Sequence, residues 1–331
     1  MYLSADPALD LGPRYIALAI QGDLVPAARL FADLDPDTST PADRALADHF
    51  RDRFIARTEP TRPDSGEPLV DDVVAAYRNY WIDVMTGSKP EREAAVDLES
   101  TLESANPGND PHSRTGSAIF DQLDLQLEAL GLHVLEEHAP PYRDLLIWRS
   151  EKMVNYRVQL TDRAHHVPVV FMDDFISMGW KHYASLGLAS TTGWVEDGKL
   201  YCVGWAYDRT SENFRVSYLK HEARHLADLE RYPELDSTEL EYRAKLTELA
   251  FAFNSLVRLL RDFTVKSAQN PDSPHALANF RVTRDIYAEL HERPFPEDGD
   301  PWEYVSTERV NRAARSLLDR HTRALGAGAG G

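Results

Sequence analysis

The chain has 331 residues, of which 43% are hydrophobic, and both values are typical of a globular protein with room for two subdomains. Its formal net charge of −18 argues against broad nucleic-acid contacts and against a basic membrane-binding face, since both need clustered Lys and Arg. The single cysteine, Cys202, excludes an internal disulfide and a cysteine-rich zinc cluster, and its apolar neighbours predict a buried small side chain.

The first 139 residues are predicted to form a helical region. Apolar side chains recur near helical spacing, and loops rich in Pro and Gly separate the segments. The segment over 70–86 carries an apolar stripe that includes Tyr77 and Trp81, which indicates a buried helix face. Gly131 is the expected stop of the last of these helices. The predicted helices cover residues 13–34, 41–57, 70–86, 90–103 and 118–132.

From about residue 140 the pattern changes to short β-like segments. Residues 153–160 and 166–172 are rich in β-branched and aromatic side chains and predict two strands joined by the turn TDRAH. A short helix is expected over 175–186. Asp197-Gly198, between two apolar runs, then predicts a tight β-hairpin. These segments indicate a small sheet in the middle of the chain.

Helical periodicity returns after the hairpin and continues almost to the end of the chain. The Gly-rich segment over 324–331 is predicted to be a flexible tail. The later helices are predicted over 212–265, with an interruption at 232–237, and over 274–291 and 306–323.

The order of these elements predicts an α+β fold that is mostly helical. We expect a helical N-terminal region over 1–139. A second domain is expected over 140–323, in which a small, mainly antiparallel sheet precedes several helices.

No segment of the sequence resembles a membrane span or a signal peptide. A spanning helix needs about 18 or more uninterrupted apolar residues, and no stretch approaches this length. The apolar patch from Tyr15 to Ile20 is too short for a signal peptide, and no basic segment precedes it. The sequence as given therefore predicts a cytoplasmic protein that binds neither membranes nor nucleic acids.

The stretch KHEARHLADLE contains the pattern H-E-x-x-H on a predicted helix. His221 and His225 are four residues apart and lie on one helix face, where both imidazoles can bind one Zn²⁺. Glu222 is rotated from His221 by about 100° around the helix axis, which places it beside the metal rather than on it. A carboxylate there can take a proton from zinc-bound water, so Glu222 is the predicted general base.

A third protein ligand is expected, because catalytic zinc usually has three such ligands and one open position. The next predicted helix offers Glu239, Glu241 and Glu248. Glu239 and Glu241 are two residues apart, about 200° around the helix, so only one of them can face the metal. We favour Glu241, because the small Ala244 beside it would let the two helices approach closely. Glu239 and Glu248 remain the alternatives.

Two more residues have expected roles near the site. Asp228, three residues after His225, either orients a histidine N–H or is a solvated acid at the end of its helix. Hydrolysis of an amide builds negative charge on the carbonyl oxygen, and His, Tyr or Arg usually helps to stabilise it. His275 is the first candidate for this catalytic role, with Tyr287 and His291 as alternatives and a surface or capping role as the competing interpretation.

His221-Glu222-x-x-His225, with Glu241 on the next helix, resembles the zincin metallopeptidases whose third ligand is a glutamate, the gluzincins. The resemblance covers roughly residues 199–253. It implies a zincin-like domain in which the strand at LYCVGWAYD aligns a peptide, His221, His225 and Glu241 bind Zn²⁺, and Glu222 is the base. The Asn-Glu pair that precedes the third ligand in better-known members is missing. The wording HEARH…ELEYRAKL is also similar to an uncharacterised bacterial group of predicted zinc proteins.

Three functions are consistent with these residues. The first is a zinc-dependent hydrolase, most plausibly a metallopeptidase. In the second, the same zinc site acts on a small non-peptide metabolite. In the third, the chain is a helical binding or regulatory protein without metal, and KHEARHLADLE is only a charged helix face. The sequence predicts a peptide or small molecule as the partner and does not indicate an oligomeric state.

Overall fold

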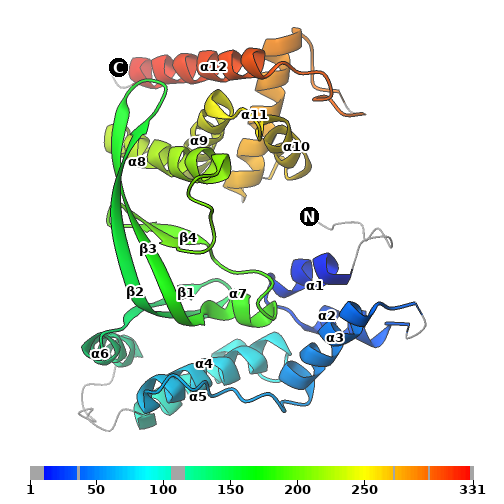
Figure 1. Ribbon diagram of the computed structural model, residues 1–331, viewed down its shortest axis with the longest axis vertical. Helices are drawn as coiled ribbons and strands as arrows, with labels where there is room; N and C mark the ends of the chain where they lie inside the picture. Colours follow the sequence, from blue (N-terminus) through cyan, green and yellow to red (C-terminus); the bar gives the residue numbers. More distant parts are fainter. Residues whose placement is uncertain (1–10, 36–37, 106–115, 271–272, 297–298, 329–331) are drawn as a thin grey trace. The chain divides into compact units, whose positions relative to one another are not determined.

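The computed structural model describes the chain except for residues 1–10, 36–37, 106–115, 271–272, 297–298 and 329–331. The fold is α+β and mostly helical, as predicted, and the sheet has five strands (Figure 1). Two compact units are formed. Unit 1 comprises Met1–Glu151 and Met172–Thr192, and unit 2 comprises Lys152–Phe171 and Gly193–Gly331. This division differs from the predicted domain boundary at 139, because the two long central strands contribute residues to both units.

Unit 1 is built mainly from helices, in agreement with the pattern of its first 139 residues. Gly131, at φ +76°, follows the last helix of this region, as expected from its position after the apolar run. The predicted loop over 104–117 lies largely outside the described residues. The helices of unit 1 are α1 (Leu11–Ala19), α2 (Val25–Ala32), α3 (Pro41–Phe50), the π-helix η1 (Arg51–Ile55), α4 (Pro68–Met85), α5 (Glu91–Ala105), α6 (Gly116–Ala129) and α7 (Gly179–Ala184).

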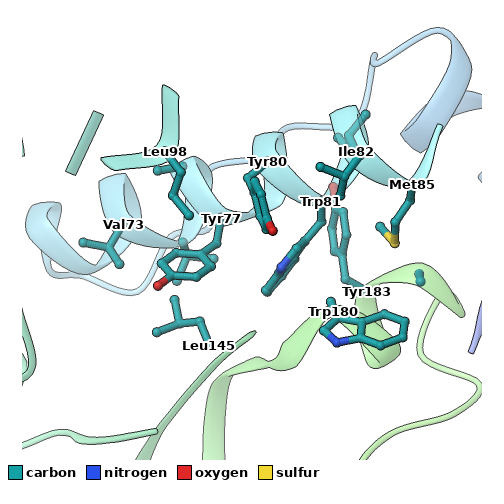
Figure 2. Close-up of a cluster of buried hydrophobic side chains, with 14 of the residues drawn as sticks. Val73, Tyr77, Tyr80, Trp81, Ile82, Met85, Leu98, Leu145, Trp180 and Tyr183 are labelled. Atoms are coloured by element: carbon teal, nitrogen blue, oxygen red, sulfur yellow. The ribbon is translucent and has the colours of Figure 1, made fainter. Parts of the chain in front are cut away.

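The core of unit 1 lies along α4. The predicted apolar stripe is buried: Tyr77 and Trp81 are both at most 1% exposed. Figure 2 shows these rings facing Leu145 of the sheet and the two aromatic residues of α7, Trp180 and Tyr183. The Trp81 and Tyr183 rings lie 5.7 Å apart. Large buried aromatic side chains of this kind supply much of the apolar area that stabilises a core.

The single helix predicted over 13–34 is wrong, because the structure has two helices there with a turn between them. Gly22 adopts φ +79°, a left-handed conformation that glycine adopts without steric cost. Pro26 occupies the first turn of α2, where a missing backbone N–H does no harm. The short helix expected over 175–186 is also shorter than predicted, since residues 175–178 still belong to a strand.

The sheet contains more strand than the sequence indicated. β1 (His133–Ala139) was missed, and it pairs antiparallel with β2 in a register that runs from His133↔Trp148 to Ala139↔Tyr142. The strand predicted over 153–160 is the last part of β2, and the one predicted over 166–172 lies in the first part of β3. The strand order is β1-β2-β3-β5-β4, with β2 (Tyr142–Gln159), β3 (Ala164–Met178), β4 (Gly193–Glu196) and β5 (Lys199–Val203).

The predicted Asp-Gly hairpin is confirmed and joins β4 to β5. Asp197 and Gly198 both have positive φ, 48° and 72°, as a two-residue hairpin turn of this type requires. A Cβ on Gly193 would lie 2.2 Å from the Tyr201 carbonyl oxygen, so only glycine fits where β4 comes this close to β5. Cys202, on β5, is fully buried, as expected.

Unit 2 is helical after the hairpin. Between its helices, residues 232–236 form the expected interruption, and a second break at 252–255 was not predicted. The last helix continues five residues beyond Arg323, so most of the predicted tail is helical. The helices are the π-helix η2 (Asn213–Lys220), α8 (His221–Arg231), α9 (Ser237–Phe251), α10 (Leu256–Val265), α11 (Pro274–His291) and α12 (Thr307–Gly328).

Helix α9 is the central element of unit 2. It packs against α8, α11, α12 and η2 (Figure 1), and all ten residues from Glu241 to Ala250 are buried. Helix α8 packs on one side against the sheet, where Ala223 and Ala227 cluster with Val169 and Leu200. It also packs against α9, whose buried residues belong to the core of the last helices. The helix that carries H-E-x-x-H is therefore fixed on two sides. No helix in the described part of the chain is long and apolar enough to cross a membrane.

Glu212 fixes the start of η2 to the turn between α9 and α10. Its carboxylate accepts hydrogen bonds from the backbone N–H groups of Phe253, Asn254 and Ser255, at 2.8–3.1 Å, and from the Ser255 hydroxyl at 2.6 Å. Burial alone would raise the pKa of Glu212, but these hydrogen bonds lower it to about 2. The ionised carboxylate therefore stabilises the folded state.

We expect Glu212→Gln to lower the free energy of unfolding at neutral pH by about 1–2 kcal/mol after allowance for solvent screening. Because the folded pKa lies below the ordinary value, the difference from wild type is full above about pH 4.5 and disappears as the pH falls through about 2. Urea unfolding across this range measures it, with the exposed Glu234→Gln as control. A difference between wild type and Glu212→Gln that does not change with pH would contradict this account.

Candidate metal centre

Three side chains from α8 and α9 bring their donor atoms together. His221 Nε2 lies 3.0 Å from His225 Nε2 and 3.7 Å from Glu241 Oε2, and His225 Nε2 lies 3.3 Å from Glu241 Oε1. The donor atoms all lie within 4.8 Å of one another and could hold one metal ion. These are the three ligands predicted from the sequence.

The spacing of this donor cluster is of the size that a tetrahedral zinc ion needs. With Zn–N and Zn–O distances of about 2.0–2.1 Å, the edges of a tetrahedron are about 3.3–3.4 Å long. The two imidazole nitrogens are 3.0 Å apart, and their shortest distances to the carboxylate are 3.7 Å, from His221 to Oε2, and 3.3 Å, from His225 to Oε1. Glu241 Oε2 is buried, and three nitrogen atoms lie around it: His275 Nδ1 at 2.9 Å, Lys245 Nζ at 3.2 Å and His221 Nε2 at 3.7 Å. This buried carboxylate oxygen is thus surrounded by groups that can carry positive charge, which keep it ionised and so suited to bind a cation.

Local helix geometry explains why the three residues meet. His221 and His225 are one turn apart on α8, and their rings stand at 74° to each other with centroids 4.7 Å apart. Helix α9 starts at an N-cap, Asp236, whose side chain accepts a hydrogen bond from the Glu239 backbone N–H. Ala244 is fully buried, which agrees with the expected close approach of α9 and its neighbours.

The other two glutamates of α9 have different partners. Glu239 binds Arg281 and His321, with shortest N–O distances of 2.6 and 2.7 Å, and does not belong to the donor cluster. Glu248 accepts a hydrogen bond from His221 Nδ1 at 2.7 Å. It therefore does not belong to the donor cluster but holds the His221 ring from its other nitrogen, and metal-binding histidines commonly have such a carboxylate partner.

The sequence contained a signal for this role of Glu248 that our prediction did not use. Glu241 and Glu248 are seven residues apart, which is close to two helical turns, so both lie on the face of α9 toward α8. Lys245 lies between them on the same face. Its ammonium group is 3.2 Å from Glu241 Oε2, and the residue is only 7% exposed.

The centre is electrostatically suited to a cation. Burial would lower the pKa of His221, but Glu241, Glu248 and the nearby charge of Glu222 raise it to about 10. Burial would likewise raise the pKa of Glu241, but its contacts with His221, His225 and His275 hold that pKa well below its usual range. Three carboxylates thus act on the His221 imidazole, and Lys245, which pairs with Glu241, adds a lysine charge beside them.

Glu222 and His275 lie at the centre without joining the donor cluster. Glu222 follows His221 on α8, is partly exposed and acts electrostatically on His221, and its role as a base stays a prediction. His275, in the first turn of α11, places Nδ1 2.9 Å from Glu241 Oε2, and its side chain is 73% exposed. The structure thus brings this predicted catalytic residue to the site. Tyr287 is a core residue of the later helices.

Both expected roles of Asp228 are wrong. It is 1% exposed and points away from the histidines into a bidentate ion pair with Arg243, with N–O distances of 2.7 and 3.0 Å. Arg224, also 1% exposed, contacts the same carboxylate at 3.3 Å and binds Asp162 at 2.7 Å. Asp228 therefore joins α8 to α9 from the inside. The sequence could not indicate a partner 15 residues away on another helix.

Replacing Glu248 with glutamine is expected to weaken zinc binding by about 10–100-fold without abolishing it. The amide keeps the size of the side chain but removes the charge that strengthens the His221 imidazole as a ligand. Competition with a chromophoric chelator measures the affinity. Glu234→Gln, which removes an exposed carboxylate between α8 and α9, is the matched control. Wild-type affinity in Glu248→Gln would contradict the role assigned to this contact.

Comparisons of the chain with models of protein families, with curated proteins and with solved structures find no match.

Proposed function

We propose that this protein is a zinc-dependent hydrolase that cleaves peptide bonds. The observation that carries the proposal is the donor cluster of His221 Nε2, His225 Nε2 and the Glu241 carboxylate, whose donor atoms lie within 4.8 Å of one another, close enough to share one zinc ion. Two imidazoles and one carboxylate form a ligand set that zinc enzymes use for catalysis, because it leaves one position for water. The three side chains are only 10–14% exposed, so the cluster is largely shielded from solvent.

The residues around the donor cluster can perform the proton transfers of hydrolysis. Zn²⁺ bound there would supply Lewis acidity, bringing the pKa of a bound water toward about 7 and stabilising negative charge on the substrate. Glu222 accepts the proton of the attacking water and passes it to the leaving amine. His275, exposed beside Glu241, is the candidate donor toward the carbonyl oxygen of the substrate. Glu248 holds the His221 ring in the orientation that presents Nε2.

The β4–β5 hairpin supports a peptide as the substrate. The strand expected to align a peptide, LYCVGWAYD, is not at the edge, because β5 lies between β3 and β4. The edge is formed instead by β4, the last strand in the sheet order, whose outer backbone groups could pair with an extended peptide. The hairpin is also tied to the helix that precedes the metal ligands, because the Tyr218 hydroxyl on η2 donates to the Tyr201 carbonyl at 3.1 Å. Hairpin and ligands belong to the same compact unit.

Glu222→Gln is expected to bind zinc like wild type and to lose at least about 100-fold in peptidase activity, because it removes the base and leaves the ligands intact. Tag-free protein is assayed for bound metal by mass spectrometry and for cleavage on mixed peptide libraries. Glu234→Gln is the control for a lost surface charge. Stoichiometric zinc without cleavage by wild type would remove the peptidase part and leave a centre for other chemistry. No bound zinc after reconstitution would refute the metal centre itself.

A further inference from the structure

A second group of polar side chains lies in unit 1, around the ring of Tyr183 on α7. The guanidinium of Arg53 lies 4.6 Å and that of Arg78 lies 5.4 Å from the centroid of this ring. Trp81 packs against it as well, at 5.7 Å (Figure 2). The ring is thus held by α4, η1 and α7 together, and two cations share its surroundings.

The two arginines differ in how far their donors are used. Arg53 makes a bidentate pair with Glu59, at 2.6 and 2.9 Å, and donates to the Tyr183 carbonyl at 3.0 Å. Arg78 donates only once, from Nη1 to the Thr61 carbonyl at 3.0 Å. Among the residues that the structure describes, no carboxylate pairs with Arg78, and its Nε and Nη2 groups have no hydrogen-bond partner.

Two neighbours of Arg78 also have unused polar groups. Neither the imidazole nitrogens of His182 nor the Tyr183 hydroxyl make a hydrogen bond within the described part of the chain, and none of these atoms is fully buried. Burial raises the pKa of Tyr183 to about 12, so its hydroxyl remains a donor at neutral pH. Burial, followed by the charges of Arg53 and Arg78, lowers the pKa of His182. Both side chains therefore lie within the field of the arginines.

Arg78 differs from two neighbouring arginines in its ion pairs. Two carboxylates pair with these neighbours: Glu59 binds Arg53, and Asp83 binds Arg57. Among the described residues Arg78 has no carboxylate at ion-pair distance, and the charge of Glu59 acts on it only from farther away, although the chain carries a net charge of −18. A partly buried guanidinium with free N–H groups is costly unless an anion or water satisfies it.

We propose that unit 1 contains a binding site for a small oxyanion, formed by Arg78, His182 and Tyr183. The Nε and Nη2 groups of Arg78 present two parallel N–H donors, the arrangement that binds two oxygens of a phosphate or carboxylate group. The Tyr183 hydroxyl and a ring nitrogen of His182 provide further donors. The ligand is thus a small molecule that carries a phosphate or a carboxylate, and the site is independent of the metal centre.

Titration calorimetry with inorganic phosphate, and separately with acetate, at about pH 7 and constant ionic strength, tests this site. We expect an anion to bind wild type and to bind Arg78→Gln at least about tenfold more weakly. Arg62→Gln is the matched control, since Arg62 is an exposed arginine of the same unit with its own partner, Asp72. Binding of phosphate but not acetate identifies a phosphate group as the ligand, and binding of both identifies an oxyanion of either kind.

Two further measurements keep the proposal testable if Arg78→Gln folds poorly. Tyr183→Phe preserves the ring and should weaken binding by about 3–10-fold through loss of one hydroxyl donor. In proton NMR of wild type, saturating phosphate should raise the pKa of His182, because a nearby anion favours the charged imidazole. The proposal is overturned if neither anion binds, if Arg78→Gln binds as well as Arg62→Gln, or if phosphate leaves His182 unchanged.

Discussion

Glu241→Gln is expected to abolish stoichiometric zinc binding, with a loss of affinity of more than about 100-fold, whereas Glu239→Gln retains zinc. Both changes remove one carboxylate from the same helix, two residues apart. Only Glu241 belongs to the donor cluster, while Glu239 binds Arg281 and His321. A lost ligand should reduce affinity more than the loss of an orienting contact, for which about 10–100-fold is typical. Metal content of tag-free protein and chelator competition measure the effect.

This pair of variants separates the metal centre from general damage to α9. Glu239→Gln breaks two ion pairs and is expected to lower thermal stability more than zinc affinity. If Glu239→Gln loses zinc and Glu241→Gln keeps it, the assignment of the third ligand is reversed. If neither change affects zinc binding, the donor cluster is not the metal centre. His225→Ala provides a positive control, because it removes a ligand from the other helix.

Asp228→Ala is expected to lower the free energy of unfolding by about 3–5 kcal/mol, the largest effect on stability that we predict. Within the part of the chain that the structure describes, the change removes the one carboxylate that pairs with Arg243 and one of the two that pair with Arg224. Both arginines are 1% exposed, so water cannot replace the lost partner without opening the structure. Urea unfolding followed by circular dichroism measures the difference.

The matched control is Glu230→Ala, on the same helix but with its side chain 65% exposed, which should change stability by less than about 1 kcal/mol. Replacing both partners with apolar residues of similar size, as in Asp228→Leu with Arg243→Met, should restore part of the loss, since no unpaired charge remains at that pair. An Asp228→Ala protein as stable as wild type would show that the pair contributes little.

The part of the site that could be predicted depends on local helix geometry. The spacing of His221 and His225 fixes their common face, and the 200° between Glu239 and Glu241 means that only one can face α8. The choice of Glu241 is consistent with the donor cluster and with the buried Ala244. Whether the centre holds zinc and hydrolyses peptides stays a prediction.

The parts that could not be predicted depend on contacts between distant segments. The sequence does not say that Asp228 meets Arg243 rather than a histidine, because that depends on the crossing of α8 and α9. The lengths of β2 and β3 were underestimated because the residues outside the predicted strands, 142–152 and 173–178, do not alternate regularly between polar and apolar side chains. Residues 145–148, a continuous apolar run rather than an alternating one, are buried together in β2. The turn near Gly22, by contrast, could have been predicted, because the segment QGDLVP contains Gly, Asp and Pro, which favour turns.

The chain crosses the division between its two compact units three times, after Glu151, Phe171 and Thr192, and this has a consequence for synthesis on the ribosome. Trp81 leaves the exit tunnel well before Trp180 and Tyr183, the aromatic residues that complete its core. At about 5–20 residues per second, that interval is about 5–20 s. During it the aromatic face of α4 is uncovered, while the first segment of the other unit has already emerged. The nascent chain therefore cannot finish one unit before it starts the next.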